Sequence, residues 1–219
     1  MIADLLPAEV AAEDIFGADP TAELLPEEYG LVAKAVDKRK LEVTNVRTAA
    51  RRALARIGIP PVPLLRGAKG QPLWPAGVVG SMTHTAGYCA AAVADIGKIR
   101  SVGIDAEVHD TLPDGVLGAI ALAEEKAQLD RLGDTGAIHW DRLLFSAKES
   151  VYKAWFPLTG RWLGFEDARI TIDPASSGFT VELLVDGETT EGPALRGFTG
   201  RYLVENGFVL TAITVPLPE

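Results

Sequence analysis

Cysteine is nearly absent from this chain of 219 residues, which holds only one. A single cysteine excludes a disulfide framework within the chain. That residue, Cys89, lies in the apolar run 88–94 and is expected to be a small buried hydrophobe, not a nucleophile. Long hydrophobic runs are also missing, and the first seven residues lack the basic and apolar regions of a signal peptide. We therefore expect a cytoplasmic protein with no membrane association.

Positive charge is scarce, with 21 Lys and Arg against 30 Asp and Glu, and the net charge of −9 argues against a general nucleic-acid binder. The basic residues are nevertheless concentrated between residues 31 and 70, where ten of them accompany two acids, a local net charge of +8. Such a patch suits a compact anion such as a nucleotide phosphate. A solvated helix face whose arginines balance acids elsewhere is the alternative.

A pair of acids stands out near the middle of the chain. Residues 101–107 alternate so strictly that Val102, Ile104 and Ala106 share one face of a strand, while Asp105 and Glu107 share the other. Two carboxylates on one strand face are hard oxygen ligands of the kind that a divalent cation prefers. The sequence therefore indicates a metal site at this strand.

A third acid follows on a long helix predicted over residues 138–156. Glu149 interrupts a stripe with helical spacing, made up of Ile138, Arg142, Phe145, Glu149, Tyr152 and Phe156. Burying an unpaired carboxylate costs several kcal/mol, so Glu149 needs a metal, a hydrogen-bond network or Lys153 as its partner. The alternative is a simple surface pair of Glu149 and Lys153, which contributes only about 0.3–0.5 kcal/mol.

The other predicted elements alternate between helices and strands. Two helices are expected at residues 22–36 and 42–57. The second carries Arg47 and Arg51 beside an apolar stripe formed by Val46, Ala50, Leu54 and Ile57, and both side chains are long enough to reach past this stripe toward a ligand. A Pro- and Gly-rich segment at 60–75 predicts an ordered loop, with Arg66, Gly67, Ala68, Lys69 and Gly70 at its centre. A plain surface turn is the alternative for this loop.

The strands complete an α+β fold of two compact halves that meet near residues 100–110. A strand at 78–85 ends with hydroxyl residues around His84, where an anion contact is conceivable but a structural histidine is more common. Residues 88–94 and 102–107 predict a hairpin. The C-terminal third alternates like an antiparallel sheet, in the segments 169–172, 179–183 and 208–215.

The two acidic motifs and their separation resemble the paired signature of the 4′-phosphopantetheinyl transferases. These motifs are residues 102–107 and 145–153, and supporting stretches lie at 80–84, 139–142 and 155–165. The chain is most similar to the Sfp type, and within it to the actinobacterial enzymes that serve polyketide and lipid synthases. The resemblance implies a pseudo-symmetric monomer of two α+β halves with coenzyme A bound between them. Residues 1–102 would then form the half with the basic coenzyme-A-binding segment, and residues 103–219 the half with the metal-binding acids and the catalytic helix.

The family implies a reaction that moves 4′-phosphopantetheine from coenzyme A to a serine of an apo acyl or peptidyl carrier protein and releases 3′,5′-ADP. The implied catalytic residues are Glu149 and Lys153. Mg²⁺, with Mn²⁺ as an alternative, would be held by Asp105, the carbonyl of Ala106, Glu107 and Glu149. The implied coenzyme A contacts are Arg39, Arg47, Arg66, Gly67, Ala68, Lys69, Thr83, His84, Asp105, Glu149, Lys153 and Leu163.

Some alternatives stay open at this point. The general base can be Glu149, a water molecule or Glu125, because a carboxylate bound tightly to a metal is a weak base. Arg66 stands where relatives often have lysine, which keeps the charge and changes the hydrogen-bond geometry. The same three acids and lysine would also suit a Mg²⁺-dependent phosphohydrolase. A non-catalytic relative that only binds carrier proteins is a third hypothesis.

Overall fold

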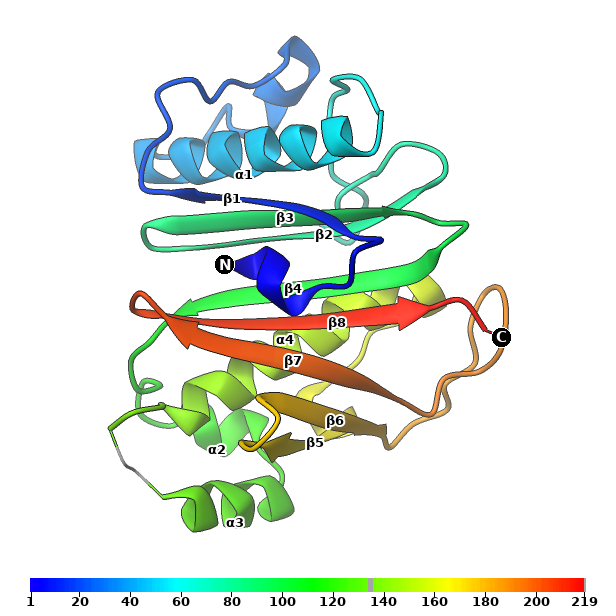
Figure 1. Cartoon of the computed structure of the whole chain (residues 1–219). Helices are drawn as coiled ribbons and strands as arrows, with labels where there is room; N and C mark the ends of the chain where they lie inside the picture. Colours follow the sequence, from blue (N-terminus) through cyan, green and yellow to red (C-terminus); the bar gives the residue numbers. More distant parts are fainter. Residues whose placement is uncertain (134–135, 219) are drawn as a thin grey trace.

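The computed structural model describes residues 1–133 and 136–218 and folds them into two antiparallel sheets with helices (Figure 1). The smaller sheet has the strand order β1-β3-β2, and the larger sheet has the order β4-β8-β7-β6-β5. The strands are β1 (Ala11–Phe16), β2 (Val78–Thr85), β3 (Tyr88–Asp95), β4 (Ile99–Val108), β5 (Ala168–Asp173), β6 (Gly178–Leu183), β7 (Gly197–Glu205) and β8 (Phe208–Pro216). The predicted α+β class with two halves is confirmed.

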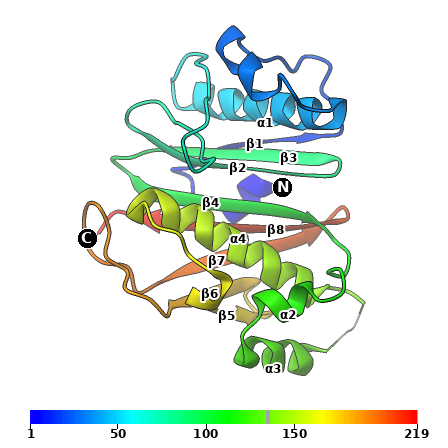
Figure 2. The same cartoon turned by 180° about the vertical axis from the view of Figure 1, so that it is seen from behind.

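Each sheet is covered by one helix of 20 residues. α1 (Asp37–Arg56) packs on β1 and β3, and α4 (Trp140–Thr159) packs on β4 and β8; Figure 2 shows α4 lying across the larger sheet. The shorter elements are η1 (Ile2–Leu5), η2 (Pro26–Leu31), α2 (Val116–Ile120), α3 (Ala123–Leu132) and η3 (Phe165–Asp167). Within the described ranges, no helix has the length and hydrophobicity that crossing a bilayer requires.

The predicted hairpin of residues 88–94 and 102–107 is wrong, because the two strands belong to different sheets. β3 pairs with β1 on one side and β2 on the other, whereas β4 pairs with β8 along its whole length. β3 is buried from Tyr88 to Ala94, as expected of a central strand with neighbours on both sides. The chain then crosses to the other half, so β4 spans the predicted domain boundary between residues 102 and 103.

The two halves meet where β2, at the edge of the smaller sheet, lies beside β4, at the edge of the larger one (Figure 1). Side-chain hydroxyls join the two edges. The Ile104 N–H donates to Ser81 Oγ, and the Ala106 N–H donates to Thr83 Oγ1, each at 3.1 Å. Because all four residues are buried, these bonds satisfy backbone groups that would otherwise lack partners.

The N-terminal helices differ from their prediction. Residues 22–36 form only η2, which begins at Pro26, and α1 begins at Asp37 and not at residue 42. Glu28 explains much of the difference: its carboxylate turns back to accept the Leu25 N–H at 2.9 Å and is fully buried, so this segment winds as a short capped turn. The apolar stripe of α1 is confirmed, with Val46, Ala50 and Leu54 all buried.

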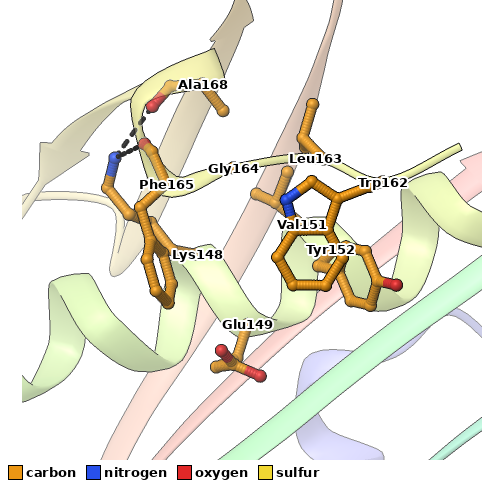
Figure 3. Close-up of a pocket in the computed structure, with 9 residues that line it drawn as sticks. All are labelled: Lys148, Glu149, Val151, Tyr152, Trp162, Leu163, Gly164, Phe165 and Ala168. Atoms are coloured by element: carbon orange, nitrogen blue, oxygen red, sulfur yellow. Dashed lines mark hydrogen bonds between the residues drawn. The ribbon is translucent and has the colours of Figure 1, made fainter. Parts of the chain in front are cut away.

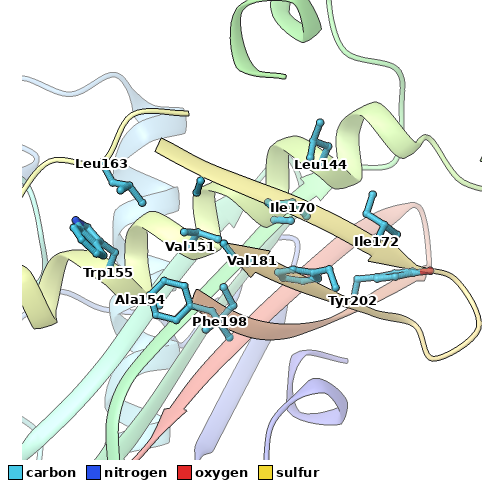
Figure 4. Close-up of a cluster of buried hydrophobic side chains, with 14 of the residues drawn as sticks. Leu144, Val151, Ala154, Trp155, Leu163, Ile170, Ile172, Val181, Phe198 and Tyr202 are labelled. Atoms are coloured by element: carbon cyan, nitrogen blue, oxygen red, sulfur yellow. The ribbon is translucent and has the colours of Figure 1, made fainter. Parts of the chain in front are cut away.

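The largest core lies between α4 and the larger sheet. Figure 4 shows Val151 and Trp155 of α4 facing Ile170 of β5 and Val181 of β6. The face of α4 that enters this core is formed by Leu143, Leu144, Ala147, Val151, Ala154 and Trp155. The stripe predicted from Ile138 to Phe156 is a different face and is only half-buried. Ile138 and Tyr152 of this stripe pack against the edge of the core, and Glu149, Tyr152 and Phe156 border the cleft described below.

Gly103 sets how closely α4 approaches β4. A Cβ atom at this position would lie 2.7 Å from the Ala154 backbone nitrogen and closer still to the Ser150 carbonyl oxygen. Only glycine allows the helix backbone to come this near to the strand. Ser101 strengthens the contact, because its hydroxyl donates to the Ala154 carbonyl at 2.8 Å. The acids of β4 are thereby placed next to the side chains of α4.

Candidate active site

Asp105 lies at the centre of the site, where β4, β2 and α4 meet. Lys153 of α4 donates to its Oδ1 at 2.7 Å, and the Thr83 hydroxyl donates to the same oxygen at 3.2 Å. The carboxylate is buried, and its Oδ2 has no hydrogen-bond partner among the residues that the structure describes. A buried carboxylate oxygen without a partner is costly, and such atoms mark functional sites.

Glu149 and Glu107 lie close enough to Asp105 to sense its charge. Burial is the main cause that raises the pKa of Glu149, the negative charge of Asp105 raises it further, and Lys153 lowers it. The pKa of Glu107 is also raised, first by burial and then by Asp105, against the opposing effect of Arg142. The three acids predicted from the sequence are therefore brought into electrostatic contact.

Two of the expected partners differ from the prediction. Lys153 forms its ion pair with Asp105, and within residues 1–133 and 136–218 it has none with Glu149. Arg142, which the sequence reasoning placed on the apolar stripe, donates to Glu107 Oε2 at 3.1 Å and to the carbonyls of Asp110 and Thr111. Arg142 thus holds Glu107 and the loop after β4 in place. The sequence pattern gave no signal of this role, because it showed only that Arg142 shares a helix face with Phe145 and Glu149.

The donor chemistry of this cluster fits a hard divalent cation. Asp105 offers a buried oxygen without a partner, and a nearby positive charge would favour the ionised forms of Glu107 and Glu149, whose pKa values are raised by burial and then by the charge of Asp105. In the described part of the chain, no three His, Cys, Asp or Glu side chains form a group that could hold a metal ion, so the support for a cation is the type of donor atom and not the geometry. Ala106, the fourth predicted ligand, is buried, and its N–H bonds to Thr83 across the junction of the halves.

Thr83 and His84 extend the site along β2. The Thr83 hydroxyl accepts the Ala106 N–H and donates to Asp105, so it braces the acid; its contact with a phosphate stays a prediction. His84 Nε2 lies 2.6 Å from Arg39 Nη1 and must accept that hydrogen bond, because a guanidinium only donates. Burial and then the charge of Arg39 lower the pKa of His84, which favours the neutral imidazole.

A cationic cavity lies on the α1 side of β2. Its walls carry Arg39, Arg47, Arg66 and His84, together with Val43, Val46, Gly70, Pro72 and Met82. Arg47 is buried and donates through Nε to the Leu64 carbonyl at 2.9 Å. Burial lowers the pKa of Arg47, and the negative charge of Glu28 opposes this effect. Three arginines of the basic segment therefore line one cavity, and their contact with a phosphate stays a prediction.

The remaining arginines of α1 balance acids. Arg51 pairs with Glu28 at 2.9 Å, Arg52 with Asp19 at 2.7 Å and Arg56 with Glu13 at 3.0 Å. The prediction that Arg51 joins Arg47 beside the ligand is wrong, because the long side chain of Arg51 reaches the buried carboxylate of Glu28 instead. Charge counting alone could not separate the arginines that face the cavity from those that face an acid.

The loop predicted at 60–75 is ordered by its own backbone. The Gly67 N–H donates to the Gln71 carbonyl at 2.8 Å, and Leu73 bonds back to Leu65 at 3.0 Å. Arg66 faces the cationic cavity and Lys69 faces the central cleft described next. Gly67 and Ala68 shape the turn and line neither of these cavities.

A central cleft of about 650 Å³ separates this loop and β2 from α4. Its α4 wall carries Glu149, Tyr152, Lys153 and Phe156, and its opposite wall carries Lys69, Trp74 and Ser81, among others. It shares Gly70, Pro72 and Met82 with the cationic cavity. This volume lies within the ~300–1,000 Å³ typical of small-molecule sites.

A third, apolar pocket, drawn in Figure 3, adjoins the central cleft. Tyr152 and Glu149 line both spaces. Leu163 forms part of its wall beside Trp162 and Phe165, and the rings of Tyr152 and Trp162 are 5.1 Å apart. Sequence reasoning found Leu163 but missed Tyr152 and Trp162 as pocket residues, because the exposure of Trp162 is visible only in the structure.

Glu125, the alternative general base, lies away from these spaces. It is buried and forms an ion pair with Lys148 at 3.0 Å, and it accepts the backbone N–H groups of Leu122 and Ile170 at 2.8 Å each. A carboxylate enclosed in this way has no path to a substrate proton. The hypothesis that Glu125 is the general base is therefore wrong, because its carboxylate is fully engaged by Lys148 and two backbone N–H groups.

Comparisons with known proteins agree with the geometry. The chain matches the family model of the 4′-phosphopantetheinyl transferase N-terminal domain over residues 27–94 and that of the 4′-phosphopantetheinyl transferase superfamily over residues 101–198. It is 51% identical to the 4′-phosphopantetheinyl transferase PptT of Mycobacterium tuberculosis (strain ATCC 25618 / H37Rv), over 98% of each chain. It is 50% identical to Svp of Streptomyces mobaraensis, over 100% of this chain and 90% of the relative. It is 49% identical to Npt of Nocardia iowensis, over 97% and 99%. The chain therefore belongs to the 4′-phosphopantetheinyl transferase superfamily.

Proposed function

We propose that this enzyme transfers 4′-phosphopantetheine from coenzyme A to a serine hydroxyl of an apo acyl or peptidyl carrier protein, with Mg²⁺ or Mn²⁺, and releases 3′,5′-ADP. The observation that carries the proposal is the continuous cleft. It joins a cationic cavity, a central space lined by Glu149 and Lys153, and an apolar pocket in that order, and neighbouring spaces share lining residues. Asp105, which pairs with Lys153, lies behind this wall and lines none of the three spaces. Coenzyme A has the same order of chemistry: a phosphorylated nucleotide, a diphosphate and a long uncharged arm.

The nucleotide and its 3′-phosphate would occupy the cationic cavity, where Arg39, Arg47, Arg66 and His84 supply donors. Lys69, at the mouth of the central cleft, would contact the diphosphate. The arm would lie against Leu163, Tyr152 and Trp162 in the apolar pocket. Gly67 and Ala68 would act through the shape of the loop that carries Arg66 and Lys69.

The divalent cation would be held by Asp105, Glu107, Glu149 and the Ala106 carbonyl. When bound, it neutralises charge on the diphosphate oxygens during the transfer. Phosphoryl transfer depends on alignment and charge neutralisation, so the rest of the work falls to the side chains of this chain.

Glu149 would accept the proton of the carrier serine, directly or through a water. Its raised pKa favours this role, because the carboxylate holds a proton more readily than an exposed glutamate does. The serine oxygen forms a bond to the phosphorus that carries the pantetheine arm, and the bond from that phosphorus to the oxygen of the ADP moiety breaks. Lys153 lies 2.7 Å from Asp105 and would offset the charge that develops on the leaving phosphate.

The remaining proposals concern organisation. We propose that residues 1–102 supply the nucleotide-binding basic segment and residues 103–219 the acids and the catalytic helix, and that the enzyme acts as a monomer in the cytoplasm. Size-exclusion chromatography with light scattering tests the monomer. A dimer at the concentration used for activity would contradict it.

Incubation with coenzyme A, Mg²⁺ and an apo carrier protein tests the function. A mass gain of one phosphopantetheine on the carrier serine is the expected result. Phosphate release without carrier modification would indicate a phosphohydrolase instead. Binding of the carrier with neither product would indicate a non-catalytic relative. Fatty-acid, polyketide and peptide-synthetase carriers assayed side by side identify which of them is the substrate.

A further inference from the structure

Two buried glutamates occupy matching places in the two halves. Glu28 is the third residue of η2 and Glu125 is the third residue of α3, and each follows the pattern Leu-x-Glu-Glu, at 25–28 and 122–125. The Oε2 atom of each carboxylate accepts the N–H of that leucine, at 2.9 Å in the first half and 2.8 Å in the second. Both glutamates are 0–1% exposed.

The second oxygen of each glutamate fixes a segment that lies far along the chain. Oε1 of Glu28 accepts the N–H of Leu64, which follows α1, and Oε1 of Glu125 accepts the N–H of Ile170, which follows α4. Both distances are 2.8 Å. The two carboxylates therefore make the same three-point junction between a short helix, a long helix and the segment after it.

A cation from the long helix completes each junction. In the first half, Arg51 donates to Glu28 at 2.9 Å, and Arg47 lies 3.9 Å from Glu28 and donates to the Leu64 carbonyl. In the second half, Lys148 lies 3.0 Å from Glu125 and donates to the carbonyls of Phe165 and Ala168 at 2.6 and 2.9 Å. All three protons of Lys148 thus have partners.

The two junctions hold walls at opposite ends of the cleft. Leu64 leads into the loop that carries Arg66 to the cationic cavity, where Arg47 also lies. Lys148, Phe165 and Ala168 line the apolar pocket (Figure 3). Neither glutamate is among the residues that line the cationic cavity, the central cleft or the apolar pocket, so each would act through the residues that it holds.

We propose that Glu28 and Glu125 are equivalent positioning residues, Glu28 for the nucleotide end of bound coenzyme A and Glu125 for its pantetheine arm. The inference rests on the proposed function. It assigns a division of labour to two residues outside the catalytic cluster, and it predicts that damage to each junction weakens a different part of the same ligand.

The test measures binding of two ligands by isothermal titration calorimetry: 3′,5′-ADP, which has the nucleotide end alone, and coenzyme A, which has both ends. Glu28→Gln should raise the Kd of both ligands by about tenfold, because a displaced wall misplaces the ligand-binding groups. Glu125→Gln should raise the Kd of coenzyme A by a similar factor and leave that of 3′,5′-ADP unchanged. A purely structural role would weaken both ligands alike in both variants.

The chain offers a matched control beside each glutamate. Glu27→Gln and Glu124→Gln make the same charge change one residue earlier on exposed side chains, and both should bind both ligands like the wild type. If a single variant does not fold, the double variants Glu28→Gln/Arg51→Met and Glu125→Gln/Lys148→Met remove the carboxylate charge together with its cation, and they should give the same two patterns.

The outcomes separate the inference from the function on which it rests. Equal loss of both ligands in the Glu125 variants, or wild-type binding in either set, would overturn the inference alone. Failure of all four variants to fold would overturn it as well, because the carboxylates would then serve folding and not binding. A wild-type chain that binds neither ligand would overturn the proposed function together with this inference.

Discussion

Replacing Gly103 by alanine tests the arrangement of the site most directly, because it adds one carbon atom where α4 crosses β4. That atom would lie 2.7 Å from the Ala154 nitrogen, 3.0 Å from the Ala154 Cβ and closer still to the Ser150 carbonyl. Ordinary contacts of a Cβ atom begin near 3.4 Å. Since the nearest atoms belong to the helix backbone and cannot rotate away, α4 must move away from β4 by about 1 Å.

The magnitude follows from what this shift displaces. Overpacking of this kind costs about 1–3 kcal/mol of stability. Lys153 and Glu149 move with α4 while Asp105 stays on β4, so the 2.7 Å contact of Lys153 with Asp105 lengthens. A misplacement of about 1 Å lowers the rate by about 10²-fold. We therefore expect Gly103→Ala to lower kcat by about 10²-fold in a protein that is still folded at the assay temperature.

The assay combines kcat for carrier modification with thermal unfolding of the same preparation. Gly118→Ala in α2 is the matched control, because a Cβ atom there meets nothing within 4 Å and alanine favours a helix by about 1 kcal/mol. That variant should retain its activity and gain stability. Wild-type kcat in Gly103→Ala would refute the reasoning, because the helix contact would then not set the geometry of the site.

Three further predictions follow from single contacts. Glu149→Gln should abolish transfer yet raise the unfolding temperature in chelator at pH 7–8. Burial raises the pKa of Glu149 above its ordinary value of 4.5, so the ionised carboxylate destabilises the folded protein at pH 7–8 and the neutral glutamine does not. The difference in unfolding temperature should become smaller as the pH falls toward 4.5, where wild-type Glu149 is protonated. An unchanged or lower unfolding temperature of the variant at pH 7–8 contradicts this prediction. Arg142→Gln should raise the Mg²⁺ concentration for half-maximal activity about 10-fold through loss of its bond to Glu107, and an unchanged metal dependence argues against it. Cys89, buried with its thiol pKa raised to about 12, should resist iodoacetamide at pH 8 until the protein is unfolded; rapid alkylation of the native protein would disprove its burial.

The strand and helix patterns predicted the acids well, because the face on which each acid lies follows from local periodicity. Asp105 and Glu107 alternate with buried apolar residues, and Glu149 and Lys153 share a face of one helix, so both sets could be placed before the fold was known. Their meeting could not be derived from the pattern. It depends on the crossing at Gly103, and any glycine in a strand is open to several explanations.

Pairing was predicted less well, because partners are set by tertiary contacts. Two adjacent strand patterns favoured a hairpin, yet β3 needed both neighbours in its own sheet. Glu28 and Glu125 were missed as buried residues because each stands beside an exposed glutamate in the same short motif, and burial of one of two neighbouring acids leaves no mark in composition. Arg51 was misplaced for a different reason, because its partner Glu28 lies 23 residues away in the sequence and local spacing does not reveal the pair.

The hydroxyl junction between β2 and β4 also bears on how the two halves can exist apart. Among the residues that the structure describes, neither strand pairs with another strand on the side that faces the other half, so separation would expose two unprotected sheet edges. Such edges recruit other chains and promote aggregation. Expressed alone, either half is therefore expected to self-associate, and co-expression of both fragments should restore solubility.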